Sequence, residues 1–210
     1  MEKKLYERRY KDYAVFSKIF AYPLNNDFKE IIINLFSKLI DFAKQVHDDS
    51  LEESLNFVIN FLKNNNAEEL NRIYTSLFIS GAYGKILCPV ESIYLDNTGL
   101  IMGEKRDIVL EIYAKDKLSL SDNFKEQEDH ISAELSYISL KNKEILNNIN
   151  NSHNYNEINN IDIQYNFINE HILPLLHYLV LDLKKYDKSR LYFETASILK
   201  KYIEYDYLDI

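Results

Sequence analysis

The chain has 210 residues, of which 46% are hydrophobic, so it is long enough to bury one substantial core. It carries 25 Lys and Arg residues against 33 Asp and Glu residues, which gives a formal net charge of −8. A charge of this sign repels phosphate backbones and attracts Arg- or Lys-rich peptides, which argues against nucleic acid as a partner. Only four glycines and three prolines occur, whereas a sandwich or barrel needs turn residues at regular spacing. The composition therefore favours long helices.

The cysteine content and the N-terminal segment bear on the compartment. The single cysteine, Cys88, cannot form an internal disulfide, and no CxxC or zinc-type Cys/His spacing occurs. We expect no bound metal or cofactor. The first 16 residues alternate charged and apolar types, so they predict neither a secretory signal nor a membrane anchor. No segment reaches the roughly 18 consecutive apolar residues of a transmembrane helix. These features predict a protein of the cytoplasm.

Apolar residues at three- and four-residue steps predict amphipathic helices in the first half of the chain. The first helix has its stripe at Tyr6, Tyr10, Tyr13, Phe16 and Phe20. Capping pairs predict the starts of the next three helices at Asp27/Glu30, Ser50/Glu53 and Asn66/Glu69. In the third helix the expected inner face consists of Leu51, Leu55, Val58 and Leu62.

The helical period is lost between Gly81 and Gly103, a stretch that contains all four glycines and predicts loops and short helical turns. The pattern returns at about 104–115 and again from about 125 to 147. The Asn-rich stretch 147–160 predicts an exposed, flexible connection, followed by helices at about 161–185 and 188–205. We predict one all-α domain over residues 1–210, a bundle of roughly eight to ten helices.

A run of acids around a histidine, Glu126-Gln-Glu-Asp129-His130, precedes Glu134 at the predicted start of a helix. Acids are favoured there by the helix dipole without any further function. That explanation does not account for His130, and the helical period would place Glu126, His130 and Glu134 on one side. Carboxylates beside a histidine can accept hydrogen bonds from a cationic peptide. The alternative is a metal-dependent helical hydrolase that uses Glu126, Asp129, His130 and Glu134.

A second set of polar residues, Glu91, Ser92 and Tyr94, lies in the irregular, glycine-flanked stretch. Polar side chains in such segments are often positioned for recognition, although Glu91 and Ser92 could also cap a short helix. Signs of catalysis are weak, because there is no GxSxG turn and no phosphate-binding glycine loop. We therefore predict a protein that is not an enzyme. His171 is interpreted as a packing or capping residue.

In this order, four motifs resemble the signature of the TorD/DmsD/NarJ family of molybdoenzyme-assembly chaperones. They are Tyr74-Thr-Ser-Leu-Phe78, Pro89-Val-Glu-Ser-Ile-Tyr94, Glu126-Gln-Glu-Asp-His130 with Glu134-Leu135, and Phe167-Ile-Asn-Glu-His171. The sequence departs from the family pattern in two respects: Gln127 stands where a proline is usual, and there is no tryptophan.

The resemblance implies a TorD-like helical bundle that acts in the cytoplasm as a chaperone. Such a protein binds the twin-arginine signal peptide and the apo form of a molybdenum-cofactor oxidoreductase, and it holds the precursor for cofactor insertion before export. Asp129 and His130 match the positions linked to peptide binding, Glu91, Ser92 and Tyr94 match the neighbouring stretch, and Glu126 is expected at the rim. A homodimer formed by helix exchange across the Asn-rich connection is compatible with this expectation.

Overall fold

The structure is a computed structural model that describes residues 2–96, 99–150 and 157–208. The described residues form ten α-helices and three short π-helical segments, and none of them belongs to a β-strand. The predicted all-α bundle of eight to ten helices is therefore confirmed. Within the described ranges, no helix is both long enough and apolar enough to cross a membrane.

Internal contacts divide the chain into two compact units. Unit 1 comprises Met1–Phe20 and Pro89–Leu175, and unit 2 comprises Ala21–Cys88 and Leu176–Ile210. Each unit is built from two separate segments of the chain, so neither can be excised as one continuous piece. The single-domain organisation over residues 1–210 stays a prediction.

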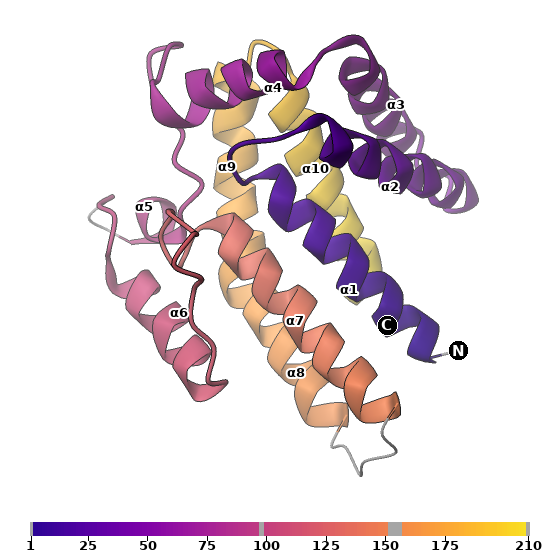
Figure 1. The fold of residues 1–210 in the computed structure, drawn as a ribbon, viewed down its shortest axis with the longest axis vertical. Coiled ribbons are helices and arrows are strands. Elements are labelled where there is room, and N and C mark those ends of the chain that lie inside the picture. Colours follow the sequence, from indigo (N-terminus) through magenta and orange to yellow (C-terminus); the bar gives the residue numbers. More distant parts are fainter. Residues whose placement is uncertain (1, 97–98, 151–156, 209–210) are drawn as a thin grey trace. The chain divides into compact units, whose positions relative to one another are not determined.

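Unit 1 is built around the pairing of its first helix with a central helix (Figure 1). Its elements are α1 (Glu2–Ile19), α5 (Glu91–Leu95), α6 (Glu104–Lys115), α7 (Ile131–Asn150), α8 (Glu157–Phe167), the π segment η2 (Ile168–Ile172) and the start of α9 (Leu173–Tyr186). The predicted stripe of α1 is confirmed at four positions, because Tyr6, Tyr13, Phe16 and Phe20 are buried. Tyr10 is half-buried. Burial of this aromatic stripe removes apolar surface from water and holds α1 in place.

The helix expected from about residue 125 begins only at Ile131. The preceding backbone forms other hydrogen bonds: Ile131 N donates to Pro89 O at 2.9 Å, and Glu91 N donates to Asp129 O at 2.8 Å. Because each peptide group has one donor and one main acceptor, groups paired across two chain segments cannot also form helical turns. The prediction that Glu126, His130 and Glu134 share one helix face is therefore wrong.

The Asn-rich stretch is described only at its two ends. Residues 151–156 lie outside the described residues, so the flexible connection stays a prediction there. Helix α7 continues to Asn150 and α8 starts at Glu157, four residues before the predicted start. From there, α8, η2 and α9 follow one another without a break in the chain. This continuity places His171 in a helical segment that packs against α7.

Unit 2 contains the remaining helices. Its elements are α2 (Asn26–Gln45), α3 (Asp49–Asn64), α4 (Ala67–Tyr74), η1 (Thr75–Ile79), the rest of α9, α10 (Leu191–Ile203) and η3 (Glu204–Leu208). Helix α3 packs against both α2 and α10. Its predicted inner face is confirmed, because the four residues are buried: Leu51, Leu55, Val58 and Leu62.

The start of α4 was predicted correctly, whereas those of α2 and α3 were predicted two residues too late. Asn66 accepts a hydrogen bond from Glu69 N at 2.9 Å, as predicted. Asn25 and Asp48 cap α2 and α3, with bonds of 2.8 and 2.9 Å to the backbone three residues on. Each is an Asn or Asp at the last non-helical position, which the three-residue capping pattern alone did not identify.

A single carboxylate organises the turn that leads into α10. Asp187 Oδ2 accepts from Tyr192 N at 2.8 Å and from Phe193 N at 3.0 Å. Its Oδ1 accepts from Ser189 N at 3.0 Å. A carboxylate is favoured here because it satisfies unpaired amides at the positive end of the helix dipole.

Candidate functional site

The two motifs predicted from the sequence lie together in unit 1. An isolated antiparallel bridge pairs Val90 with His130 and brings the start of α5 against the segment that enters α7. Four of the six predicted site residues are buried at this junction: Glu91, Ser92, Asp129 and His130. Their polar groups must therefore find partners within the protein, because burial without a hydrogen bond is costly.

Asp129 ties the two segments together. Its Oδ2 accepts a hydrogen bond from Ser92 N at 2.8 Å, at the first turn of α5. The side chain is completely buried, and its Oδ1 accepts from no donor among the described residues. Burial raises the pKa of Asp129, against the opposing effect of the Ser92 hydrogen bond. Asp129 therefore acts as an internal cap that fixes the position of α5.

His130 is a neutral capping residue at the start of α7. Its Nδ1 accepts from Ser132 N at 3.1 Å, which leaves the ring hydrogen on Nε2. Burial lowers the pKa of His130 to about 3, so the ring carries no charge at neutral pH. The ring also packs edge-on against Phe124, with the centroids 6.2 Å apart. In this position His130 orders the segment from residue 124 to α7.

Glu91 connects three elements at the centre of the site. Its Oε2 lies 2.9 Å from His171 Nδ1 on η2, and its Oε1 lies 3.5 Å from Lys105 Nζ on α6. Both Glu91 and His171 are almost inaccessible to solvent. From the sequence, His171 was expected to be a packing or capping residue, and Lys105 was not expected at the site. The signal for His171 was present in the Phe167-Ile-Asn-Glu-His171 motif, which matched the family pattern.

Glu134 completes a buried group of three carboxyls. It lies in the first turn of α7, is completely buried, and its oxygens accept from no donor among the described residues. Burial raises the pKa of Glu134 well above its usual value, and the charges of Glu91 and Asp129 raise it further. The cluster of Glu91, Asp129 and Glu134 therefore favours uptake of a proton at Glu134.

The remaining two predicted residues differ from this buried group. Tyr94 is half-buried on α5, and Glu126 is exposed in the non-helical segment before α7. In the part of the chain that the structure describes, no three His, Cys, Asp or Glu side chains are arranged to hold a metal ion. The alternative of a metal-dependent hydrolase required Glu126, His130 and Glu134 to lie on one face of a helix. That face does not exist, because α7 begins only at Ile131.

An apolar pocket of about 220 Å³ lies close to this site in unit 1. It is formed by the end of α6, the segment 118–124 and one side of α7. Its lining is mainly apolar: Tyr113, Leu118, Leu120, Phe124, Ala133, Tyr137 and Leu140. Glu126 follows two residues after Phe124 in the sequence. A pocket of this kind suits apolar side chains of a bound partner.

A family model described as the nitrate reductase delta subunit matches residues 44–180. The chain therefore belongs to this family, the NarJ/TorD type of redox enzyme maturation chaperones, whose members are non-catalytic.

A search of curated proteins finds no match. Among solved structures, the chain is similar to a protein from Archaeoglobus fulgidus assigned to redox enzyme maturation, with 24% sequence identity and a TM-score of 0.48. The similarity covers 93% of each chain.

Proposed function

We propose that this protein is a cytoplasmic chaperone for the precursor of a molybdenum-cofactor oxidoreductase. In this role it binds the twin-arginine signal peptide of the precursor and holds the apoenzyme until the cofactor is inserted, before export. Family membership supports the general role. The observation that supports the peptide-binding part is the apolar pocket of about 220 Å³, whose lining residue Phe124 packs against His130.

The pocket supplies the apolar contact that a signal peptide requires. Its volume suits one or two apolar side chains rather than a whole small molecule, since ligand pockets usually span about 300–1,000 Å³. The signal's hydrophobic stretch offers such side chains, and an extended or helical peptide can insert them into the pocket one after another.

The acidic character of the chain favours the same ligand. The net charge of −8 accelerates encounter with a segment that carries arginines. Glu126 is exposed and can contact an arginine directly, whereas Asp129 and His130 are buried and act by ordering the segment that carries Glu126. We therefore assign Glu91, Ser92, Asp129 and His130 a positioning role and Glu126 a contact role, with Tyr94 at the half-buried edge.

Titration calorimetry of the purified full chain with a synthetic twin-arginine signal peptide tests this function. Leu140 lines the pocket and is 41% exposed, so Leu140→Gln should leave the fold intact and weaken peptide binding about tenfold. Leu181→Gln is a matched control, because Leu181 is 55% exposed on α9 in unit 2, outside the pocket. Absence of peptide binding, or equal affinity of both variants and the natural chain, would contradict the proposal.

A further inference from the structure

A second cavity in unit 1 has a different chemical character from the apolar pocket. Its volume is about 280 Å³, and it is lined by residues of α6, α7, α8 and η2. Tyr137 lines both cavities and separates them. Like its neighbour, it has the size of a side-chain site rather than that of a cofactor site.

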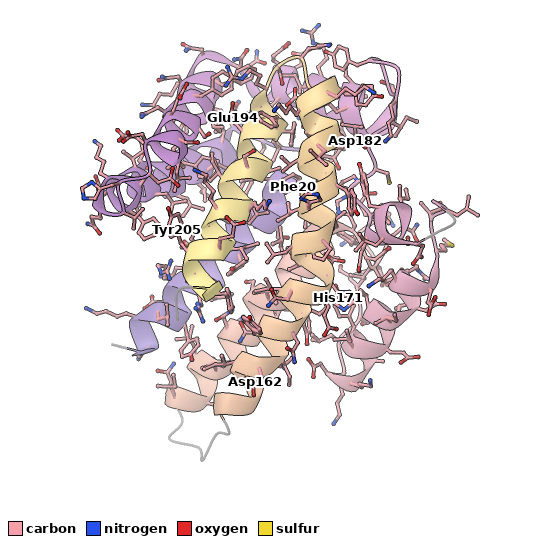
Figure 2. The ribbon with its side chains drawn as sticks, turned by 180° about the vertical axis from the view of Figure 1, so that it is seen from behind. Phe20, Asp162, His171, Asp182, Glu194 and Tyr205 are labelled. Atoms are coloured by element: carbon pink, nitrogen blue, oxygen red, sulfur yellow. The ribbon has the colours of Figure 1, made fainter. Side chains whose placement is uncertain are left out.

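Aromatic rings form one wall of this second cavity. The centroids of Tyr137 and Phe167 lie 4.6 Å apart, and those of Phe167 and His171 lie 4.7 Å apart with an interplanar angle of 35°. His171 lies on η2, the π-helical segment that directly follows α8, as Figure 2 shows. The negative faces of Tyr and Phe rings attract a cation, and a planar cation can also stack on them.

Two carboxylates at this cavity have acceptor oxygens available. Asp116 Oδ2 accepts from Tyr137 Oη at 2.7 Å and lies 3.1 Å from Lys141 Nζ. Both contacts use the same oxygen, so within the described residues Asp116 Oδ1 has no hydrogen-bond donor. Glu170 is exposed at the rim, and its carboxylate contacts no cation in the described part of the chain.

His171 lines the cavity and belongs to its aromatic wall. Because Nδ1 lies 2.9 Å from the carboxylate oxygen Glu91 Oε2, a carboxylate that only accepts places the ring hydrogen on Nδ1. This contact holds the ring, of which only 2% is exposed, in place beside Phe167. The acceptor groups at the cavity are thus the carboxylates of Asp116, directly after α6, and of Glu170 on η2.

We propose that this cavity binds the guanidinium group of an arginine side chain. Resting on the proposed function, we assign that side chain to the twin-arginine pair of the signal peptide, while the adjacent apolar pocket receives its hydrophobic stretch. Guanidinium has five donors in one plane and stacks on aromatic rings, which fits several acceptors beside an aromatic wall. An ammonium group is compact and strongly hydrated, so lysine fits this arrangement less well.

A small probe tests the site independently of any peptide. N-acetyl-arginine amide is titrated into the full chain and followed by NMR through the backbone amides of Ile163 and Asn166, which line the cavity. N-acetyl-citrulline amide is the control, because it has a similar shape without the charge. We expect shifts at these amides from the arginine probe only. No shift, or equal shifts from the two probes, would overturn the proposal.

Charge variants test the same site with the peptide. Glu170→Gln should weaken binding of the twin-arginine peptide about threefold to tenfold. Lys115→Gln should strengthen it about twofold, because Lys115 is a like charge at the same cavity. Asp162→Asn is the control, since Asp162 is exposed on α8 (Figure 2) and does not line the cavity. A peptide with both arginines replaced by glutamine should lose the distinction between these variants.

The outcomes separate this site from the proposed function. Peptide binding that depends on Leu140 but on neither Glu170 nor the arginines would overturn the guanidinium site and leave the chaperone function standing. Shifts from the arginine probe without binding of the whole peptide would support the guanidinium site and overturn signal-peptide recognition.

Discussion

Asp129 offers the sharpest test of how the site is built. In Asp129→Ala, the loss of Oδ2 leaves the buried Ser92 N–H without its acceptor at 2.8 Å. A buried donor without an acceptor lowers the free energy of unfolding by about 1–3 kcal/mol, and the lost side-chain contacts lower it further. We expect a total loss of about 2–4 kcal/mol in the free energy of unfolding. Asp129→Asn retains an acceptor and removes the buried charge, so we expect it to stay within about 1 kcal/mol of the natural chain.

The free energy of unfolding of Asp129→Asn, measured against pH, shows whether the charge of Asp129 stabilises or destabilises the fold. Because burial raises the pKa of Asp129 in the folded state, the folded state binds more protons than the unfolded state above the usual carboxyl pKa. The contribution of Asp129 to the free energy of unfolding of the natural chain therefore falls as the pH rises from about 4 through the folded pKa. Asp129→Asn lacks this loss, so its stability relative to the natural chain should increase over the same window.

Urea unfolding followed by far-UV circular dichroism measures both effects, provided that the slope of each transition is compared as well as its midpoint. Glu126→Ala serves as the control, because Glu126 is an exposed acid of the same segment and should leave stability unchanged within about 0.5 kcal/mol. Equal stability of the Ala and Asn variants would refute the account of Asp129 as a buried cap.

Three further predictions use the same unfolding measurement. Glu134→Gln should gain stability relative to the natural chain as the pH rises above about 4.5, because burial raises the pKa of Glu134; a constant difference across pH would count against a buried acid. The contribution of His130 to the free energy of unfolding should fall by up to about 1.4 kcal/mol per pH unit as the pH drops from about 6.5 towards 3, since the folded pKa of His130 is lowered to about 3. His130→Asn should therefore gain stability relative to the natural chain over this window. Asp187→Ala should cost about 2–4 kcal/mol by removing the acceptor for the first amides of α10, whereas an unchanged midpoint would show that water replaces this cap.

The hydrophobic period predicted the helices well. The stripes of α1 and α3 follow directly from apolar spacing, and the range 104–115 predicted for α6 agrees with the structure. The start of α7 was missed because the segment before it has a helix-like sequence. Its backbone instead pairs with residues 89–91, a long-range contact that no local pattern contains.

The sequence predicted which residues form the site better than it predicted their burial and their contacts. Glu91, Ser92, Asp129 and His130 were identified through the family motifs, and they do lie together. Their burial was not predicted, because acids and histidine usually lie at the surface. Lys105 gave no signal, since its ion pair with Glu91 joins residues from separate elements. The helical period also linked Glu134 to Glu126, whereas the structure groups it with Glu91 and Asp129 electrostatically.

The most direct test of the proposed chaperone function is an affinity pull-down with the tagged full chain from a lysate of its native host, analysed by mass spectrometry. The same capture is repeated with the signal peptide deleted from the recovered client. We expect enrichment of one molybdoenzyme precursor, with its signal peptide intact, and loss of that enrichment when the signal is removed. No enrichment of any such precursor, or equal capture of the client without its signal, would contradict signal-peptide recognition as the basis of the function.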